Sequence, residues 1–217
     1  MKSSIIIGLN FGGAALGAVL GFDISQDQSP HYNFDGAYSS GARFAIIKAT
    51  EGRAYRNPAF SSHYIGARGA GLIHGAYHFA HLDSSSGAEQ AKYFLENGGG
   101  WSDDGITLPG MLDLEGDCVL SASVAVSWIR DFSDTYRTST GRYPLISTSP
   151  SWWESCTGDS SAFVNTNPLV LARSSAGTPP GGWPDYTIWQ FNDAYEYGGN
   201  SDIFNGDQSG LEELASG

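Results

Sequence analysis

Short apolar runs recur along the whole chain, and they constrain its fold more than any other feature. They predict eight β-strands at residues 21–24, 44–48, 72–79, 111–114, 145–147, 169–172, 187–191 and 202–204. The runs are almost continuously apolar, which is typical of strands that are buried on both faces of a parallel sheet.

Three helical patterns lie between these strands. The first begins at Pro58 and ends near Ala70, and the second begins near residues 84–86. The third begins at Ser121 and ends before Gly141, with apolar side chains four apart at Val124, Trp128, Phe132 and Tyr136. Strands that alternate with helices predict an α/β fold, and about eight of them favour an irregular (β/α) barrel with fewer helices than strands. An open doubly wound sheet is the alternative.

The chain has 217 residues, enough for one domain with a sizeable core, and no Pro-rich or charge-rich linker divides it. Residues 1–20 carry one positive charge at Lys2, an apolar run and small residues near Ala18. This pattern predicts a secretory signal peptide at residues 1–20 and one mature domain over residues 21–217, and therefore a secreted protein. The alternative is that the apolar run forms the first buried strand of the domain.

The charge balance excludes some classes of function. The sequence has 11 basic and 23 acidic residues, a formal charge of -12, and a nucleic-acid-binding protein needs a basic face. Beyond the N-terminal run, no stretch is apolar enough to insert into a membrane. The three histidines at 74, 78 and 81 have no cysteine nearby, and no glycine-rich nucleotide loop is present. We therefore expect no metal and no cofactor. We also expect a monomer.

Asp113 and Glu115 alternate with Leu112 and Leu114. A strand would send both acids to one face, with Cα atoms roughly 6–7 Å apart. Because two negative charges disfavour each other, one pKa should rise and one acid should keep its proton. Such a pair suits the cleavage of a glycosidic bond. An ordinary strand end with two solvated charges is the alternative.

Other polar residues stand at the ends of the predicted strands. Asp23, Lys48, Tyr77, Gln190 and Asp202 would meet at one face of a barrel, the face where barrel enzymes build their active sites. Lys48 would need a partner there such as Glu51, because a buried ammonium group is costly. Among the aromatic residues that could stack on sugars, Trp189 lies at a strand end.

Cys118 and Cys156 are the two cysteines of the chain. An isolated pair in a secreted protein predicts one disulfide. Two free thiols in a cytosolic protein are the alternative.

Several segments follow one another along the chain: Gly21-Phe22-Asp23-Ile24-Ser25, Lys48-Ala49-Thr50-Glu51-Gly52, Tyr77-His78-Phe79, Leu112-Asp113-Leu114-Glu115, Trp189-Gln190-Phe191 and Asp202-Ile203-Phe204. Together and in this order they resemble glycoside hydrolase family 25. The resemblance implies an irregular (β/α) barrel and a lysozyme that cleaves the β-1,4 bond between N-acetylmuramic acid and N-acetylglucosamine in bacterial peptidoglycan. It implies Glu115 as proton donor and Asp113 as its partner, with Asp23 and Asp202 as further active-site acids.

From these patterns we expect Lys48, Tyr77, Phe79, Trp189 and Gln190 to bind the substrate. We also expect Asp113 and Asp202 to stay ionised while Glu115 holds the proton. A chitin-cleaving glycosidase, a non-catalytic cell-wall-binding barrel and a structural protein are alternatives. The sequence leaves open whether the anomeric configuration is retained, through the N-acetyl group of the substrate, or inverted through water.

Overall fold

The protein is described from a computed structural model that covers residues 17–175 and 177–217. The predicted signal peptide lies mainly in residues 1–16, outside the described residues. The first strand, β1 (Val19–Ile24), begins two residues before the predicted domain start, so the boundary expected at residue 21 falls inside this strand.

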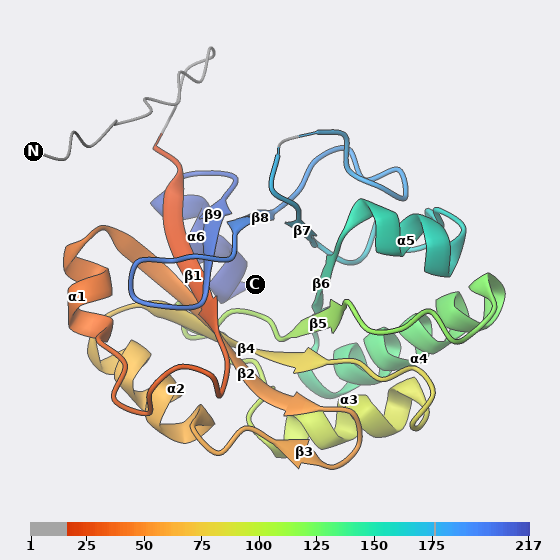
Figure 1. Cartoon of the computed structure of the whole chain (residues 1–217), viewed down its shortest axis with the longest axis horizontal. Coiled ribbons are helices and arrows are strands. Elements are labelled where there is room, and N and C mark those ends of the chain that lie inside the picture. The colour runs from red at the N-terminus through yellow and green to blue at the C-terminus, as the bar shows by residue number, and fades with distance from the viewer. Residues whose placement is uncertain (1–16, 176) are drawn as a thin grey trace, which may run out of the picture.

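Eight strands close into a barrel (Figure 1). After β1 come β2 (Ala42–Glu51), β4 (Ile73–Phe79), β5 (Met111–Leu114), β6 (Leu145–Thr148), β7 (Leu169–Ala172), β8 (Ile188–Asn192) and β9 (Asn200–Phe204). The sheet order is β1-β9-β8-β7-β6-β5-β4-β2, and a parallel pairing of β1 with β2 closes the ring. The short strand β3 (Tyr55–Arg56) pairs with the end of β2 outside the ring. The predicted barrel is confirmed, and the open sheet is excluded.

The prediction of a wholly parallel sheet is wrong for β9, which runs antiparallel to both β8 and β1. Residues 193–199 join β8 to β9, and this link is too short for the crossover of a dozen or more residues that a parallel pairing needs. As a result, the start of β9 lies at the same end of the barrel as the carboxyl ends of the other strands.

Six helices pack around the described part of the chain: α1 (Phe34–Ser39), α2 (Phe60–Gly69), α3 (Gly87–Glu96), α4 (Ala122–Thr140), α5 (Pro150–Thr157) and α6 (Gln208–Ser216). Helices α2, α3 and α4 confirm the three predicted helices, although Val124 of the predicted apolar stripe is half exposed. In Figure 1, α1 and α2 lie on one side of the barrel and α3 to α5 on the other.

The strands bury two separate layers of side chains. Residues such as Leu112 and Leu114 face outward and pack against the helices. The inward positions of all eight strands form a second cluster, which Leu211 and Ala215 of α6 close at one end: Val19, Phe44, Ile46, Ile73, Tyr77, Met111, Leu145, Val170, Ile188 and Phe204. This apolar filling supports the opposite end of the barrel, where the inward residues become polar.

Candidate active site

At the open end of the barrel, several of the side chains that point inward are carboxylates. Asp23 on β1, Asp113 on β5 and Asp202 on β9 are 5%, 7% and 1% exposed. Glu115 follows the last residue of β5 and is exposed at the surface. The charges of these acids influence one another, because Glu115 and Asp23 both raise the pKa of Asp113. The structure therefore brings together the four acids that the sequence singled out.

Asp23 is the buried acid with the best hydrogen bonding. Gln190 Nε2 donates to its Oδ2 at 2.6 Å, and Asn200 Nδ2 donates to its Oδ1 at 2.9 Å. Gly199 has φ +93°, and a side chain there would collide with the Asp23 backbone carbonyl, so glycine lets Asn200 come this close. Burial raises the pKa of Asp23 to about 6, while the two amide hydrogen bonds oppose the rise.

Asp113 and Asp202 have fewer partners than Asp23. Within the described residues, Oδ1 of each is buried without a hydrogen-bond partner. Burial raises the pKa of both groups well above the ordinary range of a carboxyl. For Asp113 the charges of Glu115 and Asp23 add to the rise, while Lys48 and Ser147 oppose it. This differs from the expectation that both acids stay ionised, because desolvation favours the neutral form.

Glu115 lines one hollow, and a second hollow begins at the residue that follows it. The first is a cavity of about 330 Å³ that Glu115 lines together with Arg173, Gln190 and Asn200. The second is a cavity of about 220 Å³ that Phe79, His81 and Gly116 line. Desolvation raises the pKa of Glu115. A proton held here is open to a ligand that spans both hollows.

A cavity of about 610 Å³ lies elsewhere, on the outer faces of α3 and α4, where Lys92, Arg130 and Asp131 line it. None of the four acids reaches this cavity. We place the site at the mouth of the barrel, because perturbed acids and neighbouring hollows coincide there.

Lys48 has the partner that the sequence predicts. Its Nζ donates to Glu51 Oε2 at 2.6 Å and lies 4.9 Å from the centre of the Phe79 ring. His81 Nε2 lies 2.8 Å from the other oxygen of Glu51. Partial burial raises the pKa of Glu51, but the hydrogen bonds from His81 and Lys48 outweigh it and lower the pKa overall. The ammonium group of Lys48 is therefore paired with Glu51 at the mouth of the barrel.

The predicted aromatic contacts divide into two groups. Tyr77 belongs to the inward cluster, and Phe79 lies beside the smaller cavity. Trp189 lies on the opposite face of β8 from Gln190, since neighbouring residues of a strand alternate. Its indole N–H donates to the Arg173 carbonyl at 2.8 Å. The structure does not place Trp189 with the carboxylates.

Three residues of the site were not among those that the sequence predicts for it. Asn200 donates to Asp23, His81 contacts Glu51, and Ser147 pairs with Asp113 across β5 and β6. Asn200 could have been found, because it lies two positions before Asp202 and so shares its face of the strand. His81 and Ser147 had no such signal. Among the described residues, no group of three His, Cys, Asp or Glu side chains could hold a metal ion.

The cysteines stand close to the acids in the sequence and in space. Cys118, three residues after Glu115, forms the predicted disulfide with Cys156 of α5. Within the described residues, no helix is both long and apolar enough to cross a membrane.

A closed (β/α) barrel whose mouth collects several acids with raised pKa values has the architecture of a glycoside hydrolase. The family model described as "Glycosyl hydrolases family 25" matches residues 22–200. The chain belongs to this family, as its sequence motifs indicated.

Known proteins similar to the chain agree with this assignment. An N,O-diacetylmuramidase from Chalaropsis sp is 60% identical over 211 residues, which cover 92% of this chain and 100% of that protein. Lysozyme M1 from Streptomyces globisporus is 42% identical and covers 94% of this chain and 74% of its own length. The solved structure of a muramidase from Trichobolus zukalii superposes with a TM-score of 0.90 at 59% identity, covering 92% of this chain and 99% of that one.

Proposed function

We propose that this chain is a secreted muramidase that hydrolyses the β-1,4 bond between N-acetylmuramic acid and N-acetylglucosamine in bacterial peptidoglycan. The observation that carries the proposal is the position of Glu115, an exposed acid with a raised pKa that lines one cavity, adjoins a second through Gly116 and lies two residues from the buried Asp113. A polysaccharide must extend to both sides of the acid that cleaves it. Relatives that are named muramidase or lysozyme support this choice over a chitin-cleaving enzyme.

Glu115 would act as the general acid. Its raised pKa keeps a proton on the carboxyl group at mildly acidic pH, and its exposure lets that group reach the leaving oxygen of a bound glycan. An acid that was fully buried could not make this contact. The exposed position therefore suits the proton donor better than any of the three buried aspartates.

Asp113 would bind the N-acetyl group of the sugar whose bond is cleaved. Its buried Oδ1 has no partner in the described part of the chain, and an amide N–H of the substrate is a donor that could satisfy it. Such a contact would orient the acetamido oxygen for attack on the anomeric carbon, and the product would keep its configuration. Asp23 has two hydrogen bonds that oppose the rise of its pKa, and its ionised form would stabilise positive charge on the sugar.

The test of the proton donor is Glu115→Gln, measured by the clearing of a bacterial cell-wall suspension. An amide cannot deliver the proton, so the rate should fall by about 10²–10⁴-fold while the melting temperature stays close to that of the wild type. Glu213→Gln is the matched control, because Glu213 is exposed on α6 at the closed end of the barrel. Activity within a few-fold of wild type in Glu115→Gln would refute the assignment.

Substrate and stereochemistry need separate measurements. The wild type should release muramic-acid-containing fragments from peptidoglycan and leave chitin intact, whereas cleavage of chitin alone would contradict the proposal. The first product, observed by NMR before mutarotation, should keep the β configuration. Inverted product would refute the role of Asp113 and would make one of the aspartates a base for water.

The proposal of secretion rests on the N-terminal pattern and on the disulfide, a bond typical of oxidising compartments. The proposal of a monomer is separate from it. Sequencing of the N-terminus of the protein recovered from culture medium should show that the apolar run has been removed, and light scattering should give the mass of one chain. An intact N-terminus on protein kept inside cells would contradict secretion.

A further inference from the structure

Glu115 has no side-chain support of its own. No hydrogen bond or ion pair joins its carboxyl group to another of the described residues. The β5–β6 ladder ends at Leu114, which pairs with Thr148, so Glu115 also lies beyond the last strand pairing. The direction in which this side chain points therefore depends on how its backbone is held.

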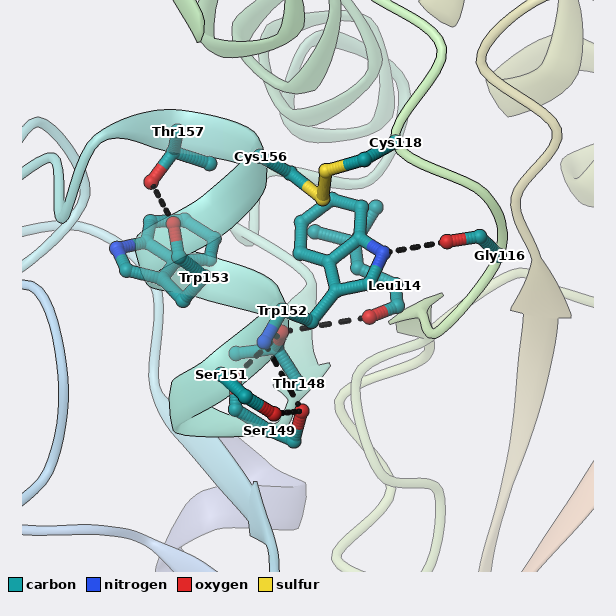
Figure 2. Close-up of a disulfide and its surroundings, with 10 residues drawn as sticks. All are labelled: Leu114, Gly116, Cys118, Thr148, Ser149, Ser151, Trp152, Trp153, Cys156 and Thr157. Atoms are coloured by element: carbon teal, nitrogen blue, oxygen red, sulfur yellow. Dashed lines mark hydrogen bonds between the residues drawn. A yellow bond between two sulfur atoms is a disulfide. The ribbon is translucent and has the colours of Figure 1, made fainter.

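The backbone is held on both sides of Glu115 by residues 148–156, as Figure 2 shows. Before it, Thr148 Oγ1 donates to the Leu114 carbonyl at 3.3 Å. After it, Trp152 Nε1 donates to the Gly116 carbonyl at 2.6 Å. The disulfide then joins Cys118 to α5. Of these contacts, the Trp152 hydrogen bond is the one made to the residue that directly follows the acid.

Helix α5 gives the Trp152 indole a firm base. The next residue, Trp153, is fully buried, its ring centre lies 5.0 Å from that of Trp183, and its Nε1 donates to the Ser160 carbonyl at 3.0 Å. Ser149 caps the helix and accepts from the Trp152 backbone N–H at 3.2 Å. Trp153 anchors α5 and Ser149 caps it, so the backbone of Trp152 is held in place. The Trp152 indole N–H is therefore a donor at a defined position.

Gly116 leaves little room for the segment to move in the other direction. A Cβ atom at this position would lie 3.2 Å from the Ala80 carbonyl, so the backbone is already close to the end of β4. The Gly116 peptide is thus enclosed between Ala80 on one side and the Trp152 indole on the other.

We propose that Trp152 is a positioning residue for Glu115: its indole N–H fixes the Gly116 carbonyl and thereby directs the acid at the leaving oxygen. This rests on the proposed role of Glu115 as proton donor. A general acid works only within hydrogen-bond reach of the oxygen that it protonates. A displacement of about 1 Å can lower the rate by about 10²-fold.

The test is Trp152→Phe, which keeps an aromatic ring and removes the N–H donor. On peptidoglycan, kcat should fall at least about tenfold while KM stays within about twofold, because an interaction needed for proton transfer is lost and substrate binding is not. The matched control is Trp101→Phe. Trp101 is also half-buried, and its Nε1 donates to the Ala215 carbonyl of α6 at 3.0 Å, at the closed end of the barrel.

Both variants lose one indole–carbonyl hydrogen bond, so their melting temperatures should fall by similar amounts. Only Trp152→Phe should lose kcat. If both variants keep the wild-type kcat, the positioning role is refuted. If Trp152→Phe raises KM and leaves kcat unchanged, the proposal is also refuted, and the ring would instead contact sugar directly.

A second substrate separates positioning of the acid from general damage to the site. A nitrophenyl β-glycoside of the peptidoglycan disaccharide has a leaving group that needs little protonation, so the kcat defect of Trp152→Phe should shrink on it. A defect of equal size on both substrates would overturn the proposal. The same pair of substrates applied to Glu115→Gln identifies the donor independently: if that variant keeps its activity on peptidoglycan, the proposed donor fails and the role of Trp152 fails with it.

Discussion

Asp23, at the mouth of the barrel, should make the stability of the protein depend on pH, and the direction of this dependence follows from its raised pKa. Burial raises the pKa of this acid from its ordinary value of 3.8 to about 6 in the folded protein. Between these two values the folded state holds a proton that the unfolded state has lost. The free energy of unfolding that Asp23 contributes is therefore fully present below about pH 4 and is lost as the pH rises through about 6.

The size of the effect follows from the pKa values. Each pKa unit corresponds to about 1.4 kcal/mol, so the whole shift is worth about 3 kcal/mol, of which about 2 kcal/mol should be lost between about pH 4 and pH 7. His78 acts in the opposite sense. It is buried between Thr50 and Gln90, which lie 2.7 and 2.9 Å from its ring nitrogens. Burial lowers its pKa to about 4, so its contribution rises with pH.

Because these contributions oppose each other, the wild type must be compared with Asp23→Asn and not considered alone. Urea unfolding of both proteins at several pH values from about 4 to 7 gives the difference between their free energies of unfolding. Asparagine does not titrate, so the cost of its altered hydrogen bonds to Gln190 and Asn200 is the same at every pH. The difference therefore reports Asp23 together with its effect on the pKa values of Asp113 and Asp202. The difference, wild type minus variant, should fall by about 2 kcal/mol as the pH rises from about 4 to 7.

Asp207→Asn is the control of opposite sign. The Asp207 carboxylate accepts from Ser209 Oγ at 2.7 Å and from the Gly210 N–H at 2.9 Å at the start of α6, and these hydrogen bonds lower its pKa. Its contribution is present above the unfolded pKa and is lost as the pH falls, so its wild-type-minus-variant difference should grow with pH below about pH 4 and stay nearly flat from there to pH 7. A flat or rising difference for Asp23→Asn would refute the argument that burial dominates this carboxylate.

Two further predictions concern the surroundings of the acids. Replacing Cys118 and Cys156 together by serine should lower the free energy of unfolding, measured with urea, by about 4 kcal/mol in the chain-entropy model for a separation of 38 residues; a loss below about 1 kcal/mol would contradict it. Glu51→Gln removes the carboxylate from Lys48, which is 7% exposed, and should cost about 1–3 kcal/mol in the same measurement. Glu213→Gln should be neutral there, and equal stability of both variants would refute the need for a partner of Lys48.

The barrel was predictable because its strands are short, apolar and separated by helices with clear start signals. Ser121 and Gly141 bound α4 as expected, and Gly141 has the left-handed φ of +82° that favours glycine at a helix end. The helices that were missed are short or terminal. α1 spans six residues and α5 eight, too few for an apolar period to stand out from the neighbouring loops.

The carboxylates were predictable because parallel strands bring their carboxyl ends to one edge. Their protonation was not, since desolvation depends on how the whole barrel closes around each group. Asp113 shows this, because a strand-end acid is ordinarily solvated whereas this one is 7% exposed. Trp189 is a different case. It was assigned by residue type, whereas alternation along β8 already placed it on the opposite face from Gln190.

The antiparallel strand β9 explains how the mouth gains a further carboxyl group beside Asp23. A parallel final strand would have placed its first residues at the closed end, among the apolar side chains that pack on α6. The short connection of residues 193–199 reverses the chain after β8, so that β9 runs from the mouth inward. Asn200 and Asp202 therefore lie on the same inward face of β9. Asn200 supplies a hydrogen bond that favours the ionised form of Asp23, while Asp202, with its raised pKa, adds a carboxyl group that need not add a charge. The reversal at β9 thus places the Asn200 amide and the Asp202 carboxyl group beside Asp23. With the raised pKa of Asp202, the barrel can hold several carboxyl groups together without charging them all.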